Sequence, residues 1–254
     1  MSPLNVSIIT FLVVVAGGFA GRLIRARLPD HHLDSSTTDT IKMGIGFLAT
    51  LAALVLGLLV SSAKASFDAK GELIRNVAVQ ILQLDGNLRR LGPLAQPVRE
   101  KVLQLVSAQV ARMGSGQEPL THMPQVGRAG GSAIVDTQHV LAAIGASDPA
   151  SRGTVDKAAE RVEQLEQFRY IAIASGGSSI TVPLLVVLLL WLSGIAAGWN
   201  VIGAPNRTVL GVTVLCALSM ACAIFLILEM DTPFGGLVHV SLEPLQAALT
   251  QLRQ

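Results

Sequence analysis

The sequence has few charged residues, few aromatic residues and only two cysteines. Charged residues make up 14% of its 254 residues and hydrophobic residues 51%, whereas about a quarter of an ordinary soluble domain is charged. The formal net charge is +2, with seven Phe, two Trp and one Tyr, which excludes a strongly basic or base-stacking surface for nucleic acid. Much of this chain must therefore face something other than water.

The cysteines give no information about the redox compartment. Cys216 and Cys222 lie in one apolar segment, and a separation of six residues places them on different faces of a helix.

Charged residues are missing from four long stretches, each close to the roughly 20 residues that a helix needs to cross a bilayer. The predicted spans are residues 4–21, 43–63, 180–199 and 209–228.

The first apolar stretch is expected to be retained as a span. A secretory signal begins with a basic region, but here Arg22, Arg25 and Arg27 follow the apolar run and nothing basic precedes it. Insertion of the third span is favoured by roughly 3 to 7 kcal/mol, because its Leu, Ile and Val residues each contribute about 0.3 to 0.6 kcal/mol.

Between the second and third spans the pattern changes to amphipathic helices. Seven apolar residues follow spacings of seven, three and four: Phe67, Ile74, Val77, Ile81, Leu84, Leu88 and Leu91. This stripe is typical of a helix that packs against other helices, and Gly92 and Pro93 are expected to end it. No Pro or Gly separates it from the second span before Gly71, so one long helix is expected to leave the bilayer. Further helices are predicted over 98–113, 134–144 and 154–172.

The predicted fold class is therefore all-α: an integral membrane protein with four transmembrane helices and a soluble helical domain inserted between the second and the third. The expected domains are a first transmembrane pair over 1–63, the soluble domain over 64–177, a second transmembrane pair over 178–230 and a C-terminal segment over 231–254. Such a chain has the lipid bilayer as its first partner.

The second span carries a strip of small residues and an adjacent strip of leucines. The small residues, which recur every four positions, are Ala49, Ala53, Gly57 and Ser61. Such strips let helices approach closely in lipid, and Gly17 with Gly21 and Gly194 with Gly198 are further pairs of this kind. A second interpretation is that this side lines a conduit in a homo-oligomer, with the leucines as a hydrophobic constriction. The candidate pore-lining residues are Leu51, Leu54, Leu58, Ser61 and Ser62.

Residues able to carry out catalysis or hold a cofactor are not evident. His31 and His32 have no acid or cysteine at ligand spacing, and no nucleophile and base form a recognisable motif, so we expect neither a metal, nor a cofactor, nor an enzyme. Glu229 and Asp231 follow the fourth span directly. They either mark the membrane interface, or cap a turn and hold a neighbouring basic residue, or contribute to a cation site at the mouth of a pore.

Two motifs stand at the ends of the second and fourth spans. The second span ends in a small, polar patch that leads into Phe67 and Asp68. The fourth ends in Glu229 and an Asp-x-Pro-Phe-x-Gly motif formed by Asp231, Pro233, Phe234 and Gly236. In these motifs the chain, from Met43 onward, resembles the bestrophin-like domain family of bacterial membrane proteins.

That resemblance implies a particular function. Bestrophins, to which the family is distantly similar, are pentameric ion channels, so the resemblance implies a homo-oligomer that passes small ions. The second span has Leu and Ala where the bestrophin neck has repeated aromatic residues. The alternative is a non-conducting membrane adaptor whose helical domain binds a partner through Val77, Ile81 and Leu84.

The membrane is expected to be a bacterial inner membrane, by the same resemblance. Four spans place both termini and the soluble domain on one side. The connector between the first two spans holds four basic residues, which by the positive-inside rule favours the opposite side as the cytosol. The resemblance favours a cytosolic soluble domain, and we adopt that orientation as the expectation.

Overall fold

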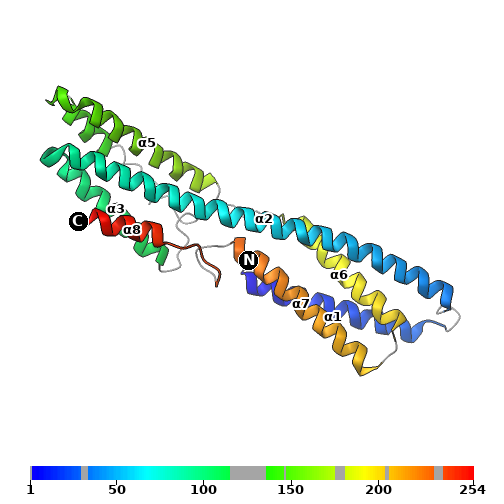
Figure 1. Ribbon diagram of the computed structural model, residues 1–254. Coiled ribbons are helices and arrows are strands. Elements are labelled where there is room, and N and C mark those ends of the chain that lie inside the picture. The colour runs from blue at the N-terminus through cyan, green and yellow to red at the C-terminus, as the bar shows by residue number, and fades with distance from the viewer. Residues whose placement is uncertain are drawn as a thin grey trace. The chain divides into compact units, whose positions relative to one another are not determined.

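The computed structural model describes residues 2–29, 34–114, 136–145, 147–174, 181–203, 206–231 and 237–254. Within those ranges every regular element is a helix and there is no strand, which confirms the predicted all-α class. Figure 1 shows the helices. Their bounds are α1 Pro3–Arg27, α2 Ser35–Arg90, α3 Gln96–Gly114, α5 Arg152–Ala174, α6 Val182–Ile202, α7 Arg207–Asp231 and α8 Glu243–Leu252, with 3-10 turns η2 Gly92–Ala95 and η3 Pro149–Ser151.

The four predicted spans correspond to α1, α2, α6 and α7, the helices long and apolar enough to cross a membrane. Ser2 caps α1, because its hydroxyl accepts a hydrogen bond from the Asn5 N–H at 3.3 Å, and Pro3 opens the first turn. Pro183 likewise falls in the first turn of α6, where its missing N–H costs nothing. The apolar runs of α1 and α6 thus begin with residues suited to helix N-termini.

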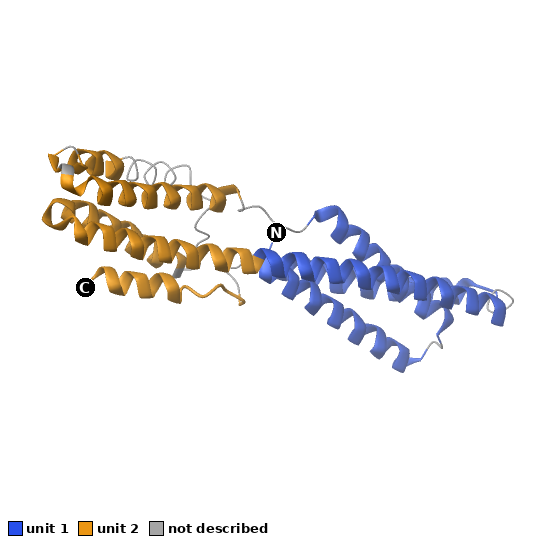
Figure 2. Ribbon diagram, turned by 45° about the horizontal axis from the view of Figure 1, so that its top comes forward, with its two compact units in different colours: residues 1–66, 178–231 blue, residues 67–177, 232–254 orange. Residues whose placement is uncertain are grey.

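The chain divides into two compact units (Figure 2). Unit 1 comprises residues 1–66 and 178–231, and unit 2 comprises residues 67–177 and 232–254. Helix α2 contributes to both, and its continuity over 56 residues confirms the expected run from the second span into the first soluble helix. At about 1.5 Å per residue it is roughly 84 Å long, far more than the roughly 30 Å of hydrocarbon in a bilayer.

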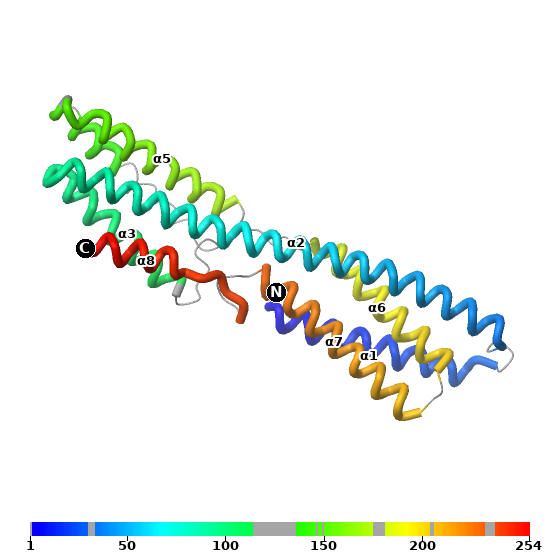
Figure 3. Tube along the Cα trace, in the orientation of Figure 1, coloured from blue at the N-terminus to red at the C-terminus, as the bar shows by residue number. Residues whose placement is uncertain are grey.

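In unit 1, α1 packs against both α6 and α7 (Figure 3). The buried core takes residues from all four membrane helices, including Val14 of α1, Leu59 of α2, Leu188 of α6 and Ile224 of α7. Large apolar side chains also face outward: Phe19 is 61% exposed, Leu190 67% and Leu215 63%. An outward apolar surface of this kind is suited to lipid and not to water.

In unit 2, the apolar stripe predicted on α2 forms the core. Ile74, Ile81, Leu84, Leu88 and Leu91 are buried, and Phe67 and Val77 pack against them. Other core residues come from α3, α5 and α8, such as Val98, Val155 and Leu245. The predicted end of the stripe is also confirmed: α2 stops at Arg90, and Gly92 takes a φ of +67°, a conformation that glycine adopts without steric cost.

Candidate functional site on the outward face of α2

The membrane part of α2 has one buried stripe and one exposed stripe. The buried stripe contains Ile45, Ala52, Leu59 and Ala63, all below 9% exposed. On the opposite face lies what we call the outer stripe, which consists of Met43, Phe47, Thr50, Leu54, Gly57 and Ser61. Its spacing of four, three, four, three and four residues is the heptad pattern by which helices associate side by side. The outer stripe is exposed along its whole length.

The residues predicted to line a pore fall on or beside this stripe. Leu54 is 68% exposed and Leu58 62%, and Ser61 is also exposed. Leu51 and Ser62 lie on the flank and are half-buried. The exposed leucines and the hydroxyls of Thr50 and Ser61 therefore share one face of α2. A second chain or lipid can contact that face.

The strip of small residues runs beside the outer stripe at Ala49 and Ala53 and joins it at Gly57 and Ser61. Ala49, Ala53 and Gly57 are exposed, and a Cβ placed on Gly57 would have no atom of the described residues within 4 Å. The same holds for Gly194 on α6. A Cβ on Gly198, in contrast, would lie 2.8 Å from Cδ1 of Ile45. Close packing by Gly57 or Gly194 stays a prediction about contacts with another chain.

Gly17 and Gly21 make a close contact between α1 and α6 in unit 1. A Cβ on Gly17 would lie 2.5 Å from the carbonyl oxygen of Ser193, and a Cβ on Gly21 only 2.2 Å from that of Ala197. Both distances are far inside van der Waals contact. The backbones of α1 and α6 therefore approach each other in the way that paired small residues allow in membranes.

A polar network joins α1, α6 and α7 at one end of unit 1. Asn200 is 2% exposed. Its amide donates to the Thr213 hydroxyl at 3.0 Å and its oxygen accepts from Nε of Arg22 at 3.3 Å. Arg25 donates to the carbonyl of Val201 at 2.7 Å, in the last turn of α6, where a cation also opposes the negative end of the helix dipole. The network fixes three helices where they leave the apolar region.

The motif residues occupy different places. Glu229 and Asp231 are 5% and 7% exposed in the last turn of α7, and each has interaction partners. Phe67 packs against the core of unit 2, and Asp68 is exposed. Pro233, Phe234 and Gly236 lie outside the described residues, as do His31 and His32. Among the residues that the structure describes, no three His, Cys, Asp or Glu side chains come close enough to hold a metal ion.

Unit 2 contains an ion cluster that the sequence analysis missed. Asp85 is 4% exposed. It accepts hydrogen bonds from Nε of Arg89 at 2.6 Å and from Nε of Arg99 at 2.7 Å. The same arginines donate to the last carbonyls of α8, at Gln251 and Leu252. The available signal was the place of Asp85 in the apolar stripe, between Leu84 and Leu88, because a carboxylate is buried only when it is paired.

Together, the apolar outward surface of unit 1 and its four long helices define a multi-pass membrane protein. The profile of the Bestrophin-like domain family matches residues 11–245, which extends the resemblance seen from Met43 onward into the first span. The chain belongs to the Bestrophin-like domain family. Neither the curated proteins nor the solved structures contain a significant match.

Proposed function

We propose that this chain forms a homo-oligomeric ion-conducting pore in a bacterial inner membrane, with the outer stripe of α2 facing the pore axis. The observation that carries the proposal is the outer stripe itself. It keeps a heptad spacing over six positions on the face opposite the chain's own core. A membrane helix that faces only lipid needs no such regularity, whereas a helix that meets its own copies does.

The chemistry of the outer stripe supports conduction. Thr50, Gly57 and Ser61 are small or polar, and hydrocarbon offers no partner for a hydroxyl beyond the helix's own backbone. The Thr50 hydroxyl uses that route, with a 2.9 Å hydrogen bond to the carbonyl of Gly46. Leu54 lies between Thr50 and Gly57, so a ring of Leu54 side chains, with Leu58 beside it, would form a hydrophobic constriction that gates by dewetting.

Family membership supports a proposal for the number of copies and for the orientation. Bestrophins, to which the family is distantly similar, are pentamers, and we propose five copies around the axis. We also propose that the soluble helices and both termini lie in the cytosol, and that the protein is not an enzyme. Lipid and small ions are then its partners, and no cofactor takes part.

For the alternative function, a non-conducting adaptor, most of the surface predicted to bind a partner is buried. Ile81 is 4% exposed and Leu84 1%, and Val77 packs against the same core. Ile81 and Leu84 are used inside unit 2, so no partner can bind them in the folded chain, and Val77 is only partly exposed. An adaptor would need another surface, and it would show no current in the experiment below.

Replacing Leu54 by serine is expected to raise the open-state current severalfold, because a hydroxyl in the constriction keeps it wetted. The measurement is the current carried by the purified full-length protein in planar bilayers, recorded in several chloride and cation salts. Leu190→Ser is the matched control, since Leu190 is equally exposed, at 67%, but lies on α6. Its current is expected to equal that of the wild type.

Two results would defeat the proposal. One is the absence of current from wild type and Leu54→Ser in every salt, together with a monomer in detergent. The other is an equal effect of Leu54→Ser and Leu190→Ser, because it would place the path for ions away from α2.

A further inference from the structure

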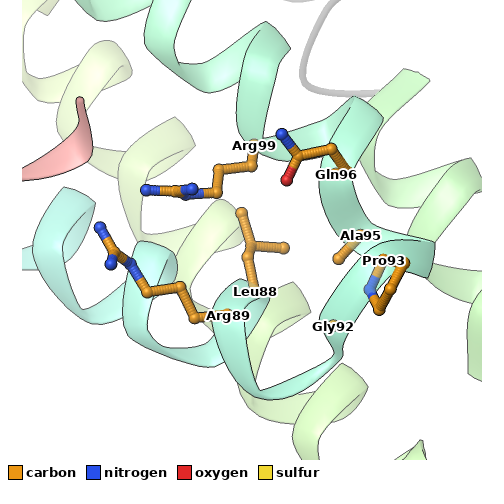
Figure 4. A pocket seen from close by; sticks show the side chains of 7 residues that line it. All are labelled: Leu88, Arg89, Gly92, Pro93, Ala95, Gln96 and Arg99. Atoms are coloured by element: carbon orange, nitrogen blue, oxygen red, sulfur yellow. The ribbon is translucent and has the colours of Figure 1, made fainter. Parts of the chain in front are cut away.

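The connection between α2 and α3 lines an open cavity of about 440 Å³ (Figure 4). Arg89 of α2 and Arg99 of α3 extend in the same direction, so that their guanidinium groups lie together at one end, while Gly92 and Pro93 form the other end. Leu88 lies between the two ends. The cavity therefore has a cationic end and an apolar remainder, and its volume falls within the range of small-molecule sites.

The cationic end has more charge and more donors than the protein uses. Two guanidinium groups face the single carboxylate of Asp85, which leaves one positive charge. Each guanidinium has five N–H donors, and Arg89 and Arg99 each use Nε and Nη2 for Asp85 and for the carbonyls of α8. Among the described residues, neither Nη1 group has an acceptor. The Nη1 groups of both arginines thus remain as donors for an oxyanion.

The charges around the opening do not cancel this excess. The side chain of Gln96 lines the cavity and donates to the carboxylate of Glu100 at 3.3 Å. Glu100 is exposed and does not line the cavity, so solvent screens its charge. Arg99, with its side chain only 22% exposed, is the better shielded of the two cations.

We propose that this cavity binds the phosphate group of a small phosphate monoester. Two guanidinium groups that lie side by side can each donate from Nη1 to a different oxygen of one phosphate, in charge-assisted hydrogen bonds. The volume exceeds what phosphate alone would fill, and the exposed Pro93 supplies an apolar surface for the organic part of the ligand, to which Leu88 and Ala95, each 1% exposed, add little. Because Arg89 and Arg99 also hold the end of α8, the bound anion contacts the same side chains that fix this helix.

The test is equilibrium binding to the full-length protein in detergent, at constant ionic strength with chloride as the balancing anion. Phenyl phosphate is the probe, inorganic phosphate tests the anion alone, and benzyl alcohol tests the apolar part alone. We expect phenyl phosphate to bind at least about tenfold more tightly than either. Equal binding of phenyl phosphate and benzyl alcohol, or no binding of phenyl phosphate at millimolar concentration, would overturn the proposal.

Variants locate the site. Gln96→Glu puts a negative charge at the cavity and leaves the Asp85 cluster intact, and we expect it to weaken phenyl phosphate binding at least about tenfold. Arg90→Gln is the control, because Arg90 is exposed and does not line the cavity. Equal affinities of Gln96→Glu and Arg90→Gln would place the anion elsewhere. Arg99→Gln should abolish the binding of phenyl phosphate. If Arg99→Gln fails to fold, the affinity of Gln96→Glu for phenyl phosphate still tests the proposal. Neither result depends on conduction.

Discussion

Alanine in place of Gly21 is expected to destabilise unit 1 by about 3 kcal/mol or more, the upper part of the range for overpacked cores. The added Cβ would lie 2.2 Å from the carbonyl oxygen of Ala197 and 2.8 Å from its Cα. These are backbone atoms in the middle of α6, so no side chain can rotate away to make room. Only a separation of α1 from α6 relieves the overlap, and that separation breaks the packing of these two helices.

Gly194→Ala is the matched control, because no atom of the described residues lies within 4 Å of its Cβ position. Alanine is the better helix former by about 1 kcal/mol, so this variant is expected to be as stable as the wild type or slightly more stable. Thermal unfolding in detergent compares the two. A Gly21→Ala protein as stable as Gly194→Ala would show that α1 and α6 do not approach as closely as described.

Asparagine in place of Asp85 is expected to destabilise unit 2 by about 1.5 to 3 kcal/mol, the range for hydrogen bonds to charged groups, because the two arginines left behind are partly exposed. Arg89 and Arg99 would lose the charge that both contact at 2.6 and 2.7 Å. Because the two arginines also hold the carbonyls of Gln251 and Leu252, the loss should spread to α8. Hydrogen exchange of the amides in α3 and α8 measures it directly.

Asp39→Asn provides the comparison for this variant. Asp39 pairs with Lys42 at 3.0 Å, but both side chains are more than half exposed, and exposed pairs are worth about 0 to 1 kcal/mol. Exchange in α3 and α8 should therefore be unchanged. If Asp85→Asn also left it unchanged, the Asp85 cluster would not be what joins α8 to α2 and α3.

The sequence predicts those features of the fold that depend on local patterns. Uncharged apolar runs mark the four membrane helices, and the stripe from Phe67 to Leu91 marks the core of unit 2, because both follow from helical periodicity and the cost of burying charge. Gly92 marks the end of α2 because glycine readily adopts the positive φ found where many helices end. The continuity of α2 follows from the absence of a helix breaker between its apolar and amphipathic parts.

Features that depend on distant residues could not be predicted. Arg99 contacts Leu252, 153 positions away, and Arg22 contacts Asn200, 178 positions away, and no periodicity relates such partners. The glycines of α6 also show that contacts between helices could not be predicted from the sequence. Gly194 and Gly198 form one pair in the sequence, yet only Gly198 touches another helix, because which face of α6 meets α2 is decided by tertiary packing.

The candidate site on α2 is an intermediate case. Small residues and leucines at regular spacing predicted an unusual face, and the structure places Leu54 and Ser61 opposite the buried stripe. The heptad pattern of the whole outer stripe becomes visible only when Ile45, Ala52 and Leu59 are known to be buried. What covers the outer stripe is a property of the assembled protein and not of one chain.

Cross-linking in native membranes tests most directly whether α2 meets α2 of other copies. The background replaces the exposed Cys216 and Cys222 by serine, and one cysteine is then introduced at Leu54 or, as the control, at the equally exposed Leu190 of α6. With a short bismaleimide, we expect covalent dimers for Leu54→Cys and monomers for Leu190→Cys. Monomers for Leu54→Cys, with dimers for Leu190→Cys, would contradict this expectation.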